Sequence, residues 1–399
     1  MKLAELSRSL KINQKLPESL EPIFNNVIGK KELFSQEYIS YIQSKYSIFD
    51  DEILELVLNA YTDILNREEL LLWSLLCIEY VNECKSSEEM QLMPMPDPDG
   101  TLAGDFISLI AIIPFIERGI EQYEKRGLSR QIALEAMRVF NEHVRWREET
   151  LGRAMFPPAS FRWTSRHLFA RIFRCGSLNF ELTEILHSIA VLENRTTGET
   201  EVVMTDRKFH NSGLVFGGPG LTDDRGAYEA DFIETENEFI ACRAQDGYVQ
   251  KERRVYPKNE WQLSSQKGDD AVYLHIPGDA DLSLETLRQS ISDGMKIIRA
   301  CYPERNDKFC YTRTWLLSPN ISNFLNPESK ILSFAKLFKR YPTPTDGREI
   351  MGYLFPSDIE NLEDLPESTS LQRRVKQFLL AGGHVYGGGG IITDTKIYK

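Results

Sequence analysis

The stretch from Tyr273 to Ser283 combines a histidine, a proline and a polar loop in a pattern that suits proton transfer beside a bound ligand. The apolar run 271–276 predicts a strand that ends at Pro277, because proline cannot donate a hydrogen bond to a sheet ladder. On that strand His275 shares a face with Tyr273. Since imidazole titrates near neutral pH, His275 is a candidate general base that takes a proton from an amine. The alternative is a structural histidine bonded to a neighbouring group.

The loop after this strand is a candidate anion site. Residues 278–283 read Gly-Asp-Ala-Asp-Leu-Ser, and the periodicity of residues 283–300 predicts a helix directly behind them. Free amides and the positive dipole end at a helix N-terminus suit a pyrophosphate. The two aspartates oppose this interpretation because they repel phosphate. Ser283 or Asp281 could instead simply cap the helix.

A second apolar segment, residues 308–317, predicts a strand that could line a cleft. Its alternation puts Tyr311, Arg313 and Trp315 on one face. Tyr311 and Trp315 are equally typical of core aromatics. Arg313 could hold a substrate carboxylate, and the alternative is a structural ion pair, because a buried guanidinium needs an acidic or anionic partner.

The elements that must position these residues alternate strand and helix. The order is the strand 271–276, the helix 283–300, the strand 308–317 and a helix opened by Asn326. This order predicts a right-handed crossover between two parallel strands. Ligand crevices lie outside the carboxyl ends of parallel strands, and His275 stands at such an end.

The first part of the chain reads as helical. Residues 51–84 carry apolar residues at helical spacing, the proline-rich segment 93–100 interrupts them, and helices are predicted over 105–125 and 129–149. Beyond residue 166 the period changes to strand alternation. The sequence therefore predicts an α+β protein with a helical domain over 1–164 and a sheet domain over 165–399.

Composition narrows the partners and the compartment. The chain has 399 residues and a formal net charge of −12, so it lacks the overall basic balance typical of proteins that bind nucleic acid or anionic membranes. No apolar run is long enough to span a bilayer, and the N-terminus lacks the features of a signal peptide. The six cysteines form no C-x-x-C pair, so we expect no metal site and a cytoplasmic protein with reduced thiols.

The glycine-rich segment 382–390 is not a nucleotide-binding motif. No helix is predicted after it, whereas the dinucleotide fingerprint needs a strand, a glycine turn and then a helix. Glycine at these positions indicates a close-packed terminal strand or a flexible tail.

At four places in order, the sequence resembles the bacterial two-domain acyltransferases that have a helical N-terminal domain and a GNAT-like C-terminal domain. The segment 173–182 resembles the opening strand of that family, and 274–277 resembles its His-Ile-Pro signature. Residues 314–319, Thr-Trp-Leu-Leu-Ser-Pro, resemble its Ser-Trp-Leu-Leu-Asp-Pro, and 329–334 resemble its Ser-Asn-Ile-x-x-Phe.

The resemblance implies a GNAT-like mixed β-sheet domain flanked by helices, and an N-acyltransferase. An acyl thioester, on coenzyme A or an acyl carrier protein, would lie where the two parallel strands separate, and an amine acceptor would attack it directly. The helical domain would cover the cleft. The implied catalytic residues are His275, Tyr311 and Thr314, and the implied substrate-binding residues are Tyr273, Arg313 and Trp315. The implied coenzyme-binding residues are Ile276, Gly278, Asp279, Ala280, Asp281, Leu282 and Ser283.

The sequence departs from the family pattern in ways that keep other functions open. The loop after His-Ile-Pro contains Asp279 and Asp281 in place of further glycines, which weakens a phosphate cradle. Thr312 stands where the family would have cysteine, which argues against a cysteine nucleophile. A non-catalytic module that binds acyl-coenzyme A, or an interaction protein on a degenerate GNAT scaffold, is therefore the alternative.

Overall fold

The computed structural model describes residues 2–30, 33–347, 350–355, 359 and 361–398. The chain divides into two compact units, Met1–Arg174 and Cys175–Lys399. The predicted domain boundary after residue 164 falls within the helix α11 (Pro158–Leu168).

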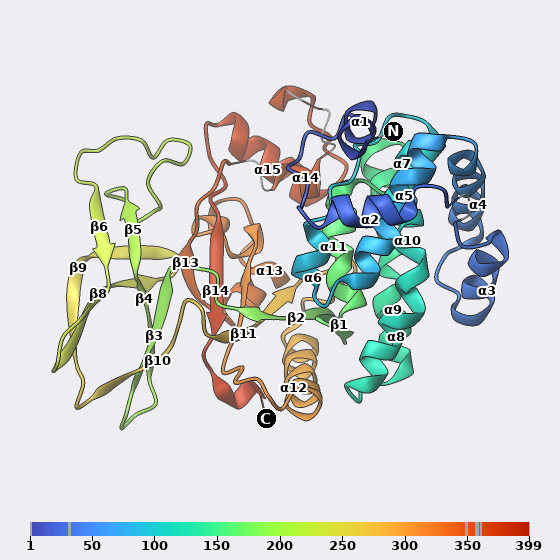
Figure 1. Ribbon diagram of the computed structural model, residues 1–399. Helices are drawn as coiled ribbons and strands as arrows, with labels where there is room; N and C mark the ends of the chain where they lie inside the picture. The colour runs from blue at the N-terminus through green and yellow to red at the C-terminus, as the bar shows by residue number, and fades with distance from the viewer. Residues whose placement is uncertain (1, 31–32, 348–349, 356–358, 360, 399) are drawn as a thin grey trace. The chain divides into compact units, whose positions relative to one another are not determined.

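Helices build the first unit, as the apolar periodicity predicts (Figure 1). Their bounds are α1 (Leu3–Ser9), α2 (Leu20–Val27), α3 (Gln36–Tyr46), α4 (Asp51–Leu65), α5 (Glu68–Glu83), α6 (Ser87–Gln91), α7 (Leu102–Ile110), α8 (Ile116–Lys125), α9 (Arg130–Met137), α10 (Val139–Leu151) and α11 (Pro158–Leu168), with a 3₁₀ turn over Ile113–Phe115.

Three predicted helical stretches of this unit are each divided, and the stretch 129–149 forms α9 and α10 on either side of Arg138. The periodic stretch 51–84 forms α4 and α5 on either side of Asn66 and Arg67, and the stretch 105–125 is interrupted at Pro114, which lies in the 3₁₀ turn between α7 and α8. Ser129 caps α9 as predicted, since its hydroxyl accepts a hydrogen bond from the Ile132 amide at 3.3 Å.

Strands dominate the second unit. They are β1 (Ile172–Cys175, which starts in the first unit), β2 (Leu178–Glu184), β3 (Ile189–Asn194), β4 (Thr200–Met204), β5 (Asp206–Phe209), β6 (Tyr228–Asp231), β7 (Ile233–Glu234), β8 (Glu238–Gln245), β9 (Tyr248–Pro257), β10 (Trp261–Gln266), β11 (Asp270–His275), β12 (Cys310–Arg313), β13 (Lys339–Pro342) and β14 (Gly388–Ile392). Its helices are α12 (Leu284–Cys301), α13 (Lys330–Ala335), α14 (Met351–Leu354) and α15 (Ser370–Leu380), with 3₁₀ turns over Trp315–Leu317, Ile321–Asn323, Leu362–Asp364 and Thr395–Tyr398.

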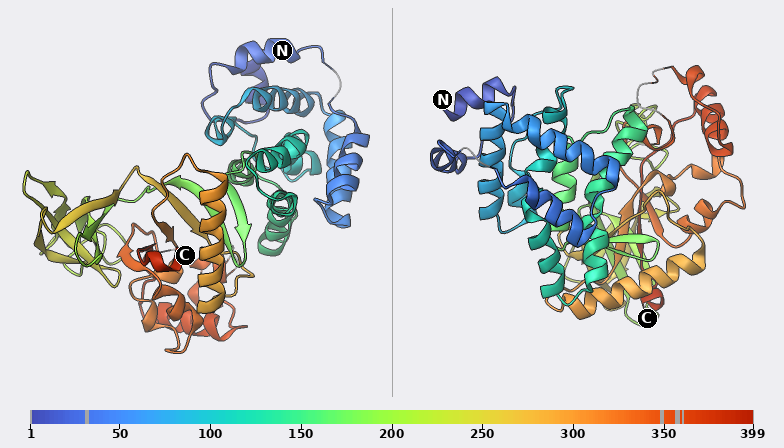
Figure 2. Two further views of the ribbon diagram at one scale, coloured as in Figure 1. Left: turned by 90° about the horizontal axis from the view of Figure 1, so that it is seen from below. Right: turned by 90° about the vertical axis from the view of Figure 1, so that its right-hand side faces the viewer.

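The first sheet has the strand order β1-β2-β11-β12-β14-β13 and is mixed. The strands β11 and β12 are parallel, as predicted, and α12 connects them, whereas β11 is antiparallel to β2 and β12 is antiparallel to β14. Figure 2 shows α12 as the long orange helix beside these strands. Its Met295 sulfur lies 3.5 Å from the Cys310 sulfur of β12, and Gly294 lies against the Phe180 ring of β2. One face of the sheet is therefore covered by α12.

The second sheet covers the opposite face. Its order is β10-β3-β4-β8-β7, with β9 also paired to β8, and β5 and β6 form a separate hairpin. One buried cluster joins both sheets: it contains Val191 and Cys242 of the second sheet together with Tyr311, Tyr341 and Ile391 of the first. Burying these side chains supplies the apolar contact that holds the two sheets together.

Two predicted elements of this unit begin or end elsewhere. The strand predicted to reach residue 317 ends at Arg313, and Trp315 lies in a 3₁₀ turn instead of on the strand face. The helix predicted to open at Asn326 begins at Lys330, because the Ser329 hydroxyl is the cap that accepts from the Ile331 amide at 3.2 Å.

The glycine run near the C-terminus forms the close-packed strand β14. A Cβ atom added at Gly388 would meet the Leu317 carbonyl oxygen at 2.1 Å, and one at Gly389 would meet the Tyr341 ring at 2.3 Å. Glycine is therefore required here because the backbone of a neighbouring segment and a buried ring occupy the space of a side chain.

This packing predicts the effect of a single methyl group. We expect Gly388→Ala to lower the free energy of unfolding by about 3 kcal/mol, because the clash is with backbone that cannot rotate away. Gly352→Ala in α14 is the matched control, since its added Cβ would meet nothing within 4 Å. Urea unfolding measures both variants, and equal stability of the two would contradict the packing argument.

Candidate active site

The strands β11 and β12 separate after a short stretch of pairing. They pair only at Val272 with Cys310 and at Tyr273 with Tyr311. Beyond that point β11 continues along β2, and its last pair is His275 with Asn179. In the same way β12 continues along β14 as far as Arg313. The two parallel strands therefore diverge at their carboxyl ends, where the sequence places the ligand.

The hydroxyl of Tyr273 occupies the start of this divergence. It donates to the Arg313 carbonyl oxygen at 2.9 Å and accepts from the Arg313 amide at 3.0 Å. In a continued parallel ladder both groups of Arg313 would bond to the backbone of β11. The phenol thus satisfies polar backbone groups that the separation would leave unpaired, at a cost of about 1–3 kcal/mol each if buried.

His275 forms a pair with a carboxylate that sequence reasoning did not select. Its Nε2 lies 2.7 Å from Oε2 of Glu181, whose side chain is 9% exposed, whereas the imidazole is 21% exposed. Glu181 stands on β2 directly opposite Tyr273. The ring of Tyr273 lies 4.7 Å from the imidazole, centroid to centroid. The imidazole is therefore fixed from two sides and still reaches solvent.

The chemistry of this pair follows from its atoms. A carboxylate only accepts hydrogen bonds, so Glu181 selects the imidazole tautomer that carries its proton on Nε2. In that tautomer Nδ1 of His275 holds the lone pair that can take a proton. The polar side chains of β2 alternate with its apolar ones, which places Glu181 on the face away from α12, but only the strand register shows that this face carries His275.

Three other residues that the sequence suggests for the site, Tyr311, Thr314 and Trp315, stabilise the backbone around it. The Tyr311 hydroxyl is buried and donates to the Glu184 carbonyl oxygen at 2.6 Å, and burial raises the pKa of this phenol. The Thr314 hydroxyl accepts from the Leu316 amide at 3.3 Å, so it caps the 3₁₀ turn that Trp315 begins. These groups hold the chain where β12 leaves β11.

The loop before α12 is organised by Asp281. This carboxylate accepts from the Ser283 hydroxyl at 2.8 Å, the Ser283 amide at 3.0 Å and the Thr286 hydroxyl at 3.0 Å, and it pairs with Lys330 at 3.0 Å. The hydrogen bonds from Ser283, followed by the one from Lys330, lower the pKa of Asp281. The carboxylate thus bonds the amide of Ser283, the residue before α12, whereas the expected side-chain cap on the first amides of the helix is absent.

The other residues predicted to bind the coenzyme lie on either side of Asp281 in this loop. The Ala280 amide donates to the Pro277 carbonyl oxygen at 3.1 Å, which makes a tight turn. Gly278 and Asp279 are exposed, and a Cβ at Gly278 would meet nothing within 4 Å. Ile276 and Leu282 are half-buried. The loop is therefore accessible, and no side chain among the described residues caps the start of α12.

A second histidine, His187, lies on the same face of the sheet as His275. Its ring contacts those of Tyr311 and Tyr341, each with centroids 5.5 Å apart, and its Nδ1 is 2.6 Å from the Tyr341 hydroxyl oxygen. Burial, followed by the charges of Arg313 and Arg207, lowers the pKa of His187 to about 4. No motif surrounds His187 in the sequence, so only the tertiary structure reveals its position.

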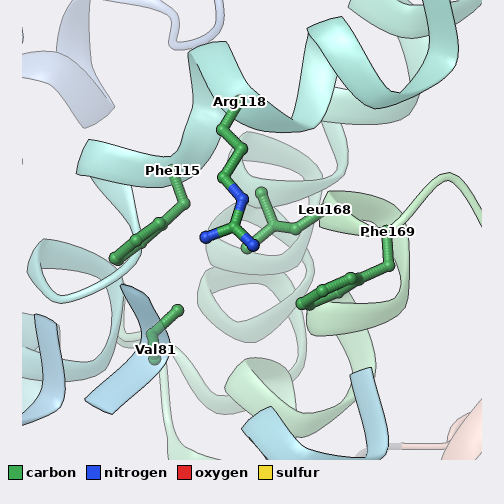
Figure 3. Close-up of a pocket in the computed structure, with 5 residues that line it drawn as sticks. All are labelled: Val81, Phe115, Arg118, Leu168 and Phe169. Carbon is green, nitrogen blue, oxygen red and sulfur yellow. The ribbon is translucent and has the colours of Figure 1, made fainter. Parts of the chain in front are cut away.

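The helical unit has a small hollow of about 10 Å³ beside Arg118 (Figure 3). The guanidinium donates to the Cys84 carbonyl oxygen at 3.0 Å and lies 6.0 Å from the centroid of the Phe169 ring. Phe115 and Leu168 also line it. A space of this size holds about one water molecule, so it is not a substrate site.

Two features are absent from the residues that the structure describes. No helix among them is long and apolar enough to cross a membrane. Within the same residues, no group of three or more histidine, cysteine or acidic side chains is arranged to hold a metal ion.

Comparisons with known proteins fit this arrangement. The family described as GNAT-like C-terminal domain matches residues 172–392, which is more than half of the chain. The protein therefore belongs to the family with a GNAT-like C-terminal domain, here preceded by a helical unit. No curated protein matches the sequence.

Solved structures match over nearly the whole chain. One is an acyltransferase variant in complex with octanoyl-CoA, with a TM-score of 0.64 and 14% identity, and another is an acyltransferase in complex with decanoyl-CoA and teicoplanin, with a TM-score of 0.63 and 14% identity. Each match covers 98% of this chain and 99% of the other. At this identity the match establishes a shared fold over both units.

The low pKa of His187 predicts acid-sensitive stability. The folded state keeps this imidazole neutral down to about pH 4, whereas the unfolded chain protonates it near its reference pKa of about 6.5. Between these values the unfolded state binds more protons, so this contribution to stability is lost as the pH falls.

The variant His187→Gln removes that contribution. The free energy of unfolding of the wild type falls between pH 7 and pH 4.5. We expect this fall to be about 2 kcal/mol smaller in His187→Gln. Urea unfolding at the two pH values measures the difference, with His210→Gln on an outer loop as the control. Parallel losses in wild type and His187→Gln would show that His187 is not buried as described.

Proposed function

We propose that the protein is an N-acyltransferase that moves an acyl group from an acyl thioester to an amine acceptor by direct attack. The observation that carries this proposal is the His275–Glu181 pair at the point where β11 and β12 diverge. The family assignment and the fold shared with acyltransferases bound to acyl-coenzyme A support it.

The thioester of the donor would lie between the diverging strands. The Val272 amide donates across to the Phe309 carbonyl oxygen of β12, and amides of alternate residues point to the same strand edge. The amide of Ile276 therefore points towards the divergence, beyond the last pair with β12. There it can donate to the thioester carbonyl oxygen and stabilise the negative charge that develops on it.

The proton transfer uses His275 as the base. The acceptor nitrogen forms a bond to the carbonyl carbon, the carbon–sulfur bond breaks, and the sulfur leaves as a thiolate, which becomes the free thiol when the proton taken up by His275 passes to it, directly or through water. The proton lost from the nitrogen passes to Nδ1 of His275, directly or through water, and Glu181 on Nε2 stabilises the imidazolium. In this proposal Tyr311, Thr314 and Trp315 support the site, because the two hydroxyls are bonded to the backbone and Trp315 is buried.

Acyl-coenzyme A is the proposed donor, and an acyl carrier protein is the other carrier of the same thioester. The solved structures with the same fold contain octanoyl-CoA, decanoyl-CoA or CoA. Lys330, paired with Asp281 at the start of α12, supplies a positive charge that could turn from that carboxylate to a phosphate of the donor.

A second candidate function is a non-catalytic module that binds acyl-coenzyme A. The specific observation in its favour is Asp281, whose negative charge lies just before α12, where the donor phosphates would be held. Both functions predict that the protein binds decanoyl-CoA. Calorimetry with that ligand therefore tests the binding of acyl-coenzyme A, which the shared fold supports. Only the acyltransferase converts an amine, and a broad amine panel with decanoyl-CoA, followed by mass spectrometry, distinguishes the two.

Replacing the base gives the direct test. We expect His275→Ala to lower kcat by about 10²–10⁴-fold, the usual contribution of a general base, and to leave the melting temperature almost unchanged, since the imidazole is partly exposed. His210→Ala is the matched control and keeps wild-type kcat. Equal loss of activity and stability in His275→Ala would assign His275 a structural role.

Replacing the carboxylate tests the pair. We expect Glu181→Gln to lower kcat by about 10- to 100-fold, the value of a charge-assisted hydrogen bond of about 1.5–3 kcal/mol. Because Glu181 positions the imidazole and does not contact the donor in this proposal, KM for decanoyl-CoA stays at the wild-type value. A rise in KM with kcat unchanged would contradict this role.

A further inference from the structure

A groove of about 240 Å³ lies on the face of the first sheet opposite α12, next to the candidate active site. Its walls are Leu186, His187, Ser188, Met204, Arg207, Lys267, Arg313, Tyr341, Pro342, Thr343 and Pro344. Every one of these residues belongs to the second unit. The groove is separate from the loop that leads into α12, where the donor phosphates were expected.

The charges in this groove are all of one sign. Arg207, Lys267 and Arg313 supply three cations, and no aspartate or glutamate is among the lining residues. Neither Arg207 nor Lys267 makes an ion pair within the part of the chain that the structure describes. His187 is neutral at pH 7 because its pKa lies near 4. In a chain with a formal net charge of −12, this groove concentrates positive potential.

Packed aromatic rings connect the wall of the groove to His275. The ring of Tyr273 lies 4.7 Å from that of His275 and 5.0 Å from that of Tyr311. The Tyr311 ring in turn lies 5.5 Å from that of His187 in the groove. Arg313 joins the two sites directly, since its backbone bonds to the Tyr273 hydroxyl and its side chain donates to the Pro344 carbonyl oxygen at 3.0 Å.

On these grounds we propose that the groove binds a carboxylate carried by the amine acceptor. This inference rests on the proposed function, because it places the acceptor amine near His275 and its anionic group near Arg207 and Lys267. The donor also carries phosphates, but its expected loop, residues 276–283, leads into α12 on the other face of the sheet. The charge of the groove and its place on the face opposite α12 therefore favour the acceptor.

Paired acceptors test the inference. ω-Amino acids from 4-aminobutanoate to 8-aminooctanoate are compared with the matching ω-amino amides, with decanoyl-CoA as donor and acylated product measured by mass spectrometry. We expect KM to be about tenfold lower for the best amino acid than for its amide, the effect of about 1.4 kcal/mol of charge interaction. In Arg207→Gln this preference falls towards unity, while KM for decanoyl-CoA is unchanged. Arg138→Gln, an exposed arginine of the helical unit, is the control and keeps the preference.

Three results would overturn the inference. Equal KM values for acids and amides would show that the groove does not select an anion. A rise in KM for decanoyl-CoA in Arg207→Gln, with the acceptor preference unchanged, would assign the groove to the donor phosphates. Wild-type protein that acylates other amines but none of the ω-amino acids would show that the groove does not serve an anionic acceptor.

A binding experiment distinguishes failure of this inference from failure of the proposed function. Glutarate is titrated into the wild type, Arg207→Gln and Lys267→Gln by calorimetry, with glutaramide as the neutral probe. We expect glutarate to bind the wild type about tenfold more tightly than either variant, and glutaramide to bind none of them. If decanoyl-CoA does not bind the protein, the proposed function fails; if decanoyl-CoA binds but glutarate does not, only the inference about the groove fails.

Discussion

The separation of two parallel strands is the constraint on which the candidate site depends. Breaking a ladder between β11 and β12 leaves backbone groups without partners, and the structure compensates at Arg313 through the Tyr273 hydroxyl. The same tyrosine ring packs against His275. One side chain therefore stabilises the opening and orients the base, because an unpaired buried amide is costly and a phenol can both donate and accept.

The surroundings of the opening explain why it stays open. On the outer side of β12, the glycines of β14 allow backbone and rings to approach so closely that no side chain fits. On the other side β2 continues to pair with β11 up to His275 and brings Glu181 to the imidazole. Each diverging strand is thus held by its outer neighbour. The outer pairing keeps each strand in place, and the Tyr273 hydroxyl satisfies the backbone groups of Arg313 that face the gap.

Two regions of the second unit differ in the charged groups that they offer to a ligand. Beside α12, Asp281 is already satisfied by hydroxyls, an amide and Lys330, which limits how a donor phosphate can bind there. On the opposite face, the cations of the groove have no acidic neighbour among its lining residues. A two-substrate reaction needs both reactants at one base, and His275 stands at the strand ends between these regions. This arrangement is why the acceptor and the donor are assigned to opposite faces.

The sequence alone determined the features that depend on local chemistry. The apolar period predicted α12, the position of Pro277 predicted the end of β11, and the strand–helix–strand order predicted the parallel pair, because helix and strand patterns are set by nearby residues. The tertiary structure decided what depends on register and on loss of pairing. Only the alignment of β2 with β11 brings Glu181 to His275, and Trp315 leaves the strand face because β12 ends at Arg313. The groove around His187 joins segments that lie far apart in the chain, so no local pattern could indicate it.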